Sequence, residues 1–156
     1  MKNQQSAESF AEYLVRGKKA DGTWAVLLND EQMHIAEADI EMYCNPDSGR
    51  CSKVVRLYTP TEDMTRRGLS IGLQRDFLPG KYPVDENSSF VTYTMFRRWD
   101  EAIGGWYPVG YPAREGFIEL ISSSEERQQM HARFEVIVVT DGQRHKYSGE
   151  FDVHAA

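Results

Sequence analysis

Apolar and polar residues alternate with a period of two over several stretches of the chain. In the clearest stretch, Ala36, Ala38, Ile40, Met42 and Cys44 alternate with Glu37, Asp39, Glu41 and Tyr43. Residues 69–74 and 147–153 repeat the pattern. Successive side chains of a β-strand point to opposite faces, so this period predicts strands with one packed and one solvent-facing side.

Two other stretches, 90–96 and 134–139, carry β-branched or aromatic residues at nearly every position. Such stretches are typical of strands that are covered on both faces. Residues 23–28, 53–59 and 116–121 complete the set of predicted strands.

Asp-Gly pairs at residues 21–22 and 141–142 favour tight hairpin turns, because both residue types adopt positive φ angles readily. About eight or nine strands, with no helix long enough to join parallel neighbours, predict an all-β antiparallel sandwich or flattened barrel. No repeat or linker is visible, which predicts a single domain over residues 1–156. Residues 9–17 fit a short N-terminal helix with a capping box, and they fit a strand equally well.

Composition narrows the classes of function. The chain has 18 basic and 24 acidic residues, a net charge of −6 and a pI near 5.2. Nucleic-acid binding needs a basic surface, so this balance argues against a nucleic-acid partner. No apolar stretch approaches the roughly 20 residues of a membrane helix, so no membrane association is expected. Residues 1–6 contain no apolar signal sequence, which predicts a cytoplasmic protein.

The region 69–153 contains several recurring features. It combines an alternating strand at 69–73, a Pro-Gly-x-Tyr turn at 79–82, further strands at 91–93 and 116–120, and a final Ser-Gly-Glu-Phe-Asp-Val strand at 148–153. Together these features resemble a class of uncharacterised bacterial β-sandwich domains. The resemblance implies a β-sandwich fold and a bacterial type of protein. It implies no functional site, because the shared motifs are turn glycines and core aromatic residues.

The two cysteines, Cys44 and Cys51, bracket residues 45–50 between two predicted strands. Opposed cysteines across a hairpin can form a disulfide, which we expect only if the protein is exported. In the cytosol both stay reduced, and Cys44 shares the parity of the apolar face, so the expected state is a buried thiol. Two cysteines with no nearby histidine do not make a zinc site, and no metal or cofactor is predicted.

The four histidines are His34, His131, His145 and His154, and none belongs to a known catalytic motif. A set of histidine, carboxylate and nucleophile can still assemble from scattered positions. The sequence nevertheless assigns no catalytic residue, and the histidines are interpreted as surface or loop residues.

Glu37, Asp39 and Glu41 form an acidic stripe on one face of a predicted strand. The simplest interpretation is a solvated face, because neighbouring like charges repel each other and favour water. The functional alternative is a docking surface for a basic partner.

Residues 97–112 hold two of the three tryptophans together with tyrosines, prolines and glycines. Proline and a Gly-Gly pair interrupt strand pairing, so this segment is predicted to be an extended loop. Trp, Tyr and Arg are enriched at binding hot spots. The candidate binding residues are Arg97, Arg98, Trp99, Trp106, Tyr107 and Tyr111. The alternative is that the tryptophans cap the core.

These observations favour a non-enzymatic binding domain with a protein partner, for example an adaptor or an inhibitor of the immunity type. Two other classes stay open: a carrier of a small apolar ligand in the mouth of a barrel, and an enzyme of unassigned class. The apolar strand at 134–139 is also compatible with a homo-oligomer, in which a second subunit covers the sheet.

Overall fold

The structure is a computed structural model that describes residues 18–44, 46–60, 66–74, 76–85, 91–100, 102 and 104–156; at 43, 95–100 and 105–108 it describes only the backbone. The described residues contain eleven strands and no helix. The strands are β1 (Lys18–Leu28), β2 (Glu31–Met33), β3 (Glu37–Cys44), β4 (Cys51–Tyr58), β5 (Arg67–Gln74), β6 (Gly80–Asp85), β7 (Val91–Asp100), β8 (Gly105–Pro112), β9 (Glu115–Ser124), β10 (Gln129–Thr140) and β11 (Gln143–Ala155). The possible N-terminal helix at 9–17 lies outside the described residues.

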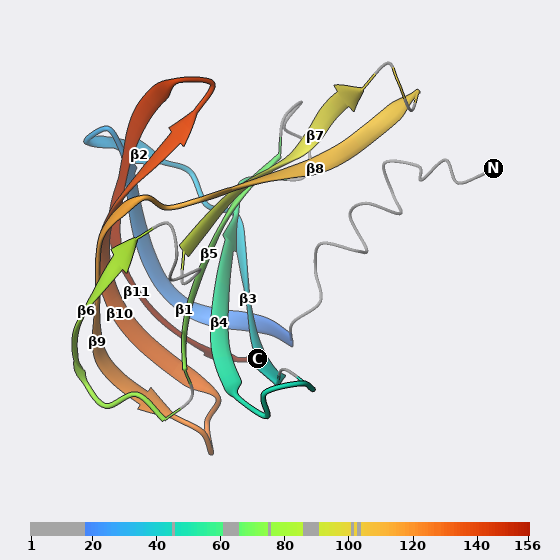
Figure 1. Cartoon of the computed structure of the whole chain (residues 1–156). Coiled ribbons are helices and arrows are strands. Elements are labelled where there is room, and N and C mark those ends of the chain that lie inside the picture. The colour runs from blue at the N-terminus through green and yellow to red at the C-terminus, as the bar shows by residue number, and fades with distance from the viewer. Residues whose placement is uncertain are drawn as a thin grey trace.

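All strands belong to one antiparallel sheet with the order β6-β9-β10-β11-β1-β3-β4-β5-β7-β8, and β2 pairs with β1. The sheet curls into a half-barrel (Figure 1). The long strand β1 lies at the bend, because it pairs with β11 over most of its length and with β3 only at residues 18–20. The predicted all-β antiparallel class is therefore confirmed.

The chain passes from β8, at one edge of the sheet, directly to β9, next to the other edge. Two residues make this crossing. The Ala113 amide donates to the Val91 carbonyl at 2.8 Å, and the Arg114 amide donates to the Ile137 carbonyl at 2.8 Å. Backbone hydrogen bonds thus tie the two sides of the curl together at this point.

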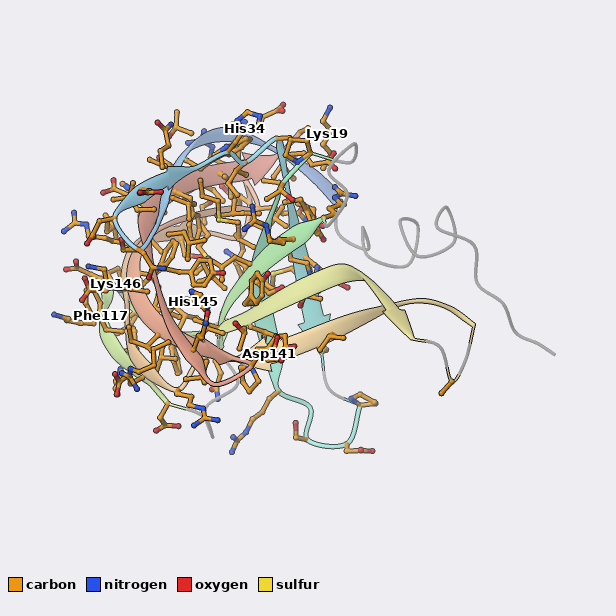
Figure 2. All side chains as sticks on the ribbon, turned by 90° about the horizontal axis from the view of Figure 1, so that it is seen from above. Lys19, His34, Phe117, Asp141, His145 and Lys146 are labelled. Atoms are coloured by element: carbon orange, nitrogen blue, oxygen red, sulfur yellow. A yellow bond between two sulfur atoms is a disulfide. The ribbon has the colours of Figure 1, made fainter. Side chains whose placement is uncertain are left out.

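The core fills the inside of the curl. Buried side chains recur at every second position, as in Phe134, Val136 and Val138 of β10. Phe134 packs against Phe151 of β11 with their ring centroids 6.3 Å apart. The view from above shows side chains occupying the space enclosed by the strands (Figure 2).

Three strands were missed by the sequence interpretation, which expected eight or nine. They are β2, β6 and β8. The strand β2 has only three residues, too few to show a period. The strands β6 and β8 contain prolines, and both lie at the edges of the sheet, where a missing amide hydrogen need not break a ladder.

The two predicted Asp-Gly turns have opposite outcomes. The turn at 141–142 is confirmed, with φ angles of 50° and 80° between β10 and β11. The turn at 21–22 is wrong, because both residues lie inside β1. Gly22 pairs with Val153, and a Cβ atom on it would lie 2.1 Å from the Asp152 carbonyl oxygen. The glycine therefore permits a close approach of two strands, and the actual turn is at Asn29 and Asp30, with φ angles of 50° and 67°.

The strand at 134–139 is covered less completely than its composition predicts. Glu135 is exposed, and Ile137 and Val139 are half-buried, so one face of β10 is in the core and the other is partly open to solvent.

No helix in the described parts of the chain has the length and apolar character needed to span a membrane.

Candidate functional site

The segment 97–112 forms a β-hairpin and is not the extended loop that its prolines and glycines suggested. It comprises the end of β7 and all of β8, with Trp99 opposite Trp106 and Arg98 opposite Tyr107 in the backbone register. Gly104, with a φ angle of 65°, lies in the turn. Proline is tolerated here because β8 is an edge strand, whose outward-facing amide positions have no partner.

Among the residues that the structure describes, the outer part of this hairpin has no neighbouring strand on the β7 side. β7 pairs with β5 only from Val91 to Met95, whereas its pairing with β8 continues to Asp100. Residues 96–100 and 105–108 therefore form a two-stranded ribbon within the described part of the chain, here called the aromatic ribbon. Figure 1 shows it projecting from the half-barrel in yellow and light orange.

The base of the aromatic ribbon is anchored by three tyrosines. Tyr111 of β8 is half-buried and stacks on Tyr93 of β7, with ring centroids 6.1 Å apart. Tyr93 also stacks on Tyr147 of β11 at 5.4 Å, so the contact crosses the interior. Burial raises the pKa values of Tyr93 and Tyr147, and both stay protonated at neutral pH. Of the predicted binding residues, Tyr111 therefore joins the core, whereas the side chains at 97–99, 106 and 107 lie outside the described residues.

The three acidic residues of β3, Glu37, Asp39 and Glu41, form ion pairs with two arginines. Arg56 of β4 donates to Asp39 Oδ1 at 3.2 Å and to Glu41 Oε2 at 2.6 Å. Arg66 forms an ion pair with Glu37. The predicted acidic stripe is thus a network of ion pairs in which each carboxylate has a cationic partner.

Asp39 is the most enclosed member of this network, with only 1% of its side chain exposed. The Tyr58 hydroxyl donates to its Oδ2 atom at 2.7 Å, and Arg66 lies 4.7 Å from the centre of the Tyr58 ring. Burial raises the pKa of Asp39, although Tyr58 and Arg56 favour its charged form. A partner cannot reach this carboxylate from outside, so any docking role of the stripe falls to Glu37 and Glu41.

One serine, one histidine and one aspartate lie in a row across three strands. Ser122 of β9 is opposite His131 of β10, which is opposite Asp152 of β11. The row does not form a catalytic triad. His131 Nε2 lies 2.9 Å from Glu150, and the Ser122 hydroxyl accepts a hydrogen bond from Gln129 at 3.1 Å. No hydrogen bond joins the serine to the histidine in the described structure, so the base required by such a nucleophile is absent.

The other histidines are dispersed as well. His34 follows β2, while His145 and His154 lie on β11. His145 has Asn29 as a neighbour, with 3.4 Å between their side-chain nitrogens. Within the described ranges, no three His, Cys, Asp or Glu side chains gather as a metal site requires.

Cys44 and Cys51 form a disulfide across the end of the β3–β4 hairpin, where the register places them opposite each other. Cys44 is exposed and Cys51 is half-buried. The expectation of a buried thiol at Cys44 is therefore wrong, because the position lies at the end of the strand, beyond the part of the sheet that covers the core. The hairpin arrangement that makes a disulfide possible was visible in the spacing.

Comparison of the chain with the models of known protein families, with curated proteins and with solved structures finds no match. The resemblance of residues 69–153 to bacterial β-sandwich domains stays a prediction, and function has to be argued from the geometry above.

Proposed function

We propose that this protein is a non-enzymatic interaction protein that binds a partner protein through the aromatic ribbon. The observation that carries the proposal is that residues 98–100 of β7 pair with β8 and, within the described ranges, with no second strand. An isolated two-stranded ribbon is marginally stable in water. A ribbon rich in Trp, Tyr and Arg with no described strand on one side is well suited to contact another protein.

The edge of β8 favours recognition by side chains over strand addition. Pro108 and Pro112 cannot donate backbone hydrogen bonds, so the free edge offers an incomplete row of donors to an incoming strand. Specificity would then come from the residue types at 97–99, 106 and 107, which are those found at binding hot spots. The net charge of −6 favours a basic partner.

The alternative of a small-ligand carrier has no observation in its favour. The described residues that face the inside of the curl are packed against one another, and Val55, Leu57, Leu69 and Ile71 have 0% exposure. An apolar ligand needs an apolar cavity, and three of the six described residues that line the pocket discussed below carry a charge.

The sequence predicts a cytoplasmic location. The Cys44–Cys51 disulfide argues against this location but not against the proposed binding function. Disulfides persist mainly in oxidising compartments. Alkylation of free thiols in intact cells before lysis distinguishes the two cases. If the agent labels both cysteines, they are reduced in the cell, which would support a cytoplasmic location. If Cys44 and Cys51 stay unlabelled, the disulfide is present in the cell, which would support an oxidising compartment.

The test of the interaction compares three proteins on an affinity column loaded with native lysate. Wild type and Phe117→Ala should retain the same partner, and Trp99→Ala/Trp106→Ala should lose it. Phe117 is the matched aromatic control because it lies on the outside of β9, away from the ribbon (Figure 2), with the Lys81 ammonium 4.1 Å from its ring centre. All three must first show the same β-sheet circular dichroism spectrum.

The affinities of wild type and the double variant for the captured protein then show how much the two tryptophans contribute to binding. Loss of two hot-spot tryptophans should weaken binding at least about 30-fold, which corresponds to about 2 kcal/mol. Equal affinity of the double variant and wild type would refute the proposed site.

A further inference from the structure

A pocket of about 360 Å³ lies at the end of the half-barrel where the β3–β4 and β9–β10 hairpins turn. Both hairpin ends are at the bottom of Figure 1. Its walls are Gly49, Arg50 and Cys51 from the first hairpin, Gln74 and Asp76 from the end of β5, and Glu125 from the second hairpin. A space of this volume can hold a small molecule.

The disulfide forms part of the pocket wall on one side only. Cys51 lines the pocket, whereas Cys44 does not and is exposed to solvent. Exposed disulfides are the ones that exchange with external thiols. A molecule in the pocket therefore lies beside Cys51, whereas Cys44, at the other end of the bond, is open to water.

The charged side chains of the pocket suit a cationic molecule. Of the described residues that line it, one is a cation, Arg50, and two are carboxylates, Asp76 and Glu125. The carboxylates attract an ammonium group, and amide and carboxylate oxygens can accept its hydrogen bonds. Arg50 and Cys51 line the same pocket, and a guanidinium near a thiol stabilises the thiolate that exchange requires.

The surrounding sheet allows the bond to open without unfolding the hairpin. β3 and β4 are paired over eight positions, from Glu37 opposite Tyr58 to Cys44 opposite Cys51. Breaking the disulfide at the last position leaves the other pairs in place. The two sulfurs stay opposite each other and can form the bond again.

We propose that this pocket is a thiol–disulfide exchange site for a small thiol that carries an ammonium group. The thiolate of the small molecule attacks Cys51 Sγ, the bond to Cys44 breaks, and Cys44 leaves as a thiolate. A second small thiolate then attacks the outer sulfur of the mixed disulfide and releases Cys51 as a thiolate. The protein disulfide is reduced to two thiols, and two small thiols are oxidised to one disulfide.

The test uses three small thiols of different charge on the oxidised full-length protein: cysteamine, 2-mercaptoethanol and 2-mercaptoethanesulfonate. Rates are compared at equal thiolate concentration, since the thiolate is the nucleophile. Trypsin cleaves after Arg50 and so separates the two cysteines into different peptides. Mass spectrometry should find the trapped adduct on the Cys51 peptide, and cysteamine should react about fivefold faster than the sulfonate.

A variant without the two pocket carboxylates tests whether the pocket causes the difference between the exchange rates of the three thiols. Asp76→Asn/Glu125→Gln should bring the rates for cysteamine and the sulfonate close together. Asp141→Asn, which changes an exposed carboxylate in the β10–β11 turn, should keep the wild-type order. An adduct mainly on Cys44, rates independent of thiol charge, or no exchange under conditions that reduce an unstructured disulfide peptide would each overturn the proposal.

Discussion

Two hairpins of the same sheet, β3–β4 and β7–β8, differ in what surrounds them. The first is flanked by β1 on one side and by β5 on the other, and a disulfide closes its end. The second lies at the edge of the sheet, and none of the described strands lies beside the outer part of its β7 strand. The first hairpin forms the wall of the core, whereas the second extends beyond it.

The residue types of the two hairpins match these positions. β4 carries Val55 and Leu57 on its inner face, both with 0% exposure, and its outer face holds the arginine and tyrosine of the ion-pair network. The aromatic ribbon contains a proline, a glycine and aromatic residues in place of regular alternation. We infer that the first hairpin serves the stability of the half-barrel and that the second serves binding.

The sharpest test of this division is the free energy of unfolding of variants in each hairpin. Leu57→Ala should cost about 2–5 kcal/mol, because it removes a fully buried side chain and leaves a cavity. Trp99→Ala/Trp106→Ala should cost less than about 1 kcal/mol if these residues contact a partner and not the core. Urea unfolding measures both. A large loss from the double variant would support the alternative in which the tryptophans cap the core.

Removal of the disulfide should have the next largest effect. Cys44→Ser/Cys51→Ser should lower the free energy of unfolding by about 2 kcal/mol, because the bond closes a short loop of the unfolded chain. Affinity for the partner of the ribbon should not change. Reducing agent should destabilise wild type by the same amount and leave the variant unaffected; an identical unfolding midpoint for all of these samples would contradict the structural role of the bond.

A buried lysine joins the first hairpin to the opposite side of the half-barrel. Lys53 is 3% exposed, and its ammonium donates to Ser123 Oγ at 2.6 Å and to the carbonyls of Ser124 and Gln129 at 3.2 Å each. Lys53→Met should cost about 1–2 kcal/mol. The penalty for the unpaired carbonyls is partly offset, because the variant no longer buries a charge.

The matched control is Lys146→Met, which removes a surface ion pair with Asp30 at 2.9 Å. Exposed pairs contribute little, so urea unfolding should show a much smaller change for Lys146→Met than for Lys53→Met. Equal effects of the two lysine substitutions would mean that the buried contacts of Lys53 do not stabilise the fold.

The difference between the hairpins also explains how far the sequence could predict the structure. β3 and β5 follow the period of two because each has one face in the core, and the alternation at 36–44 and 69–74 located both. The sequence of β8 could not be interpreted in this way. Its prolines argue against a strand only when both edges of that strand are paired. Whether β8 lies at the sheet edge depends on contacts between segments that are distant in the chain.

The same limit applies to the candidate sites. The opposed position of Cys44 and Cys51 was accessible to sequence reasoning, because they flank a turn, but the expected state was a buried thiol and not the disulfide. The partners of Glu37, Asp39 and Glu41 were not, because Arg56 and Arg66 lie on later segments that only the strand register brings alongside. The pocket beside Cys51 depends on the β9–β10 turn, which is more than seventy residues away in the chain.

The smallest predicted effect is a change in how stability depends on pH. The folded-state pKa of Asp39 is raised above its ordinary value of 3.8, with burial as the largest cause. The folded protein therefore holds this proton to higher pH than the unfolded chain does. The contribution of Asp39 to stability is complete below pH 3.8 and is lost as the pH rises through the folded-state value.

Asp39→Asn resembles the protonated carboxyl and does not titrate. The stability of this variant should therefore not fall as the pH rises through the folded-state pKa of Asp39. Its oxygen can still accept the hydrogen bond from Tyr58, and Arg56 keeps Glu41 as a partner. Compared with wild type, the variant should gain relative stability when urea unfolding is repeated from pH 4 to pH 7. Asp141→Asn provides the same change of charge at the exposed turn between β10 and β11. If the stability difference between Asp39→Asn and wild type stays constant over this range, the pKa of Asp39 is the same in the folded and the unfolded protein. Its arginine and tyrosine partners would then offset the cost of burying its charge in full, and the outer face of the first hairpin would hold a charged aspartate without loss of stability.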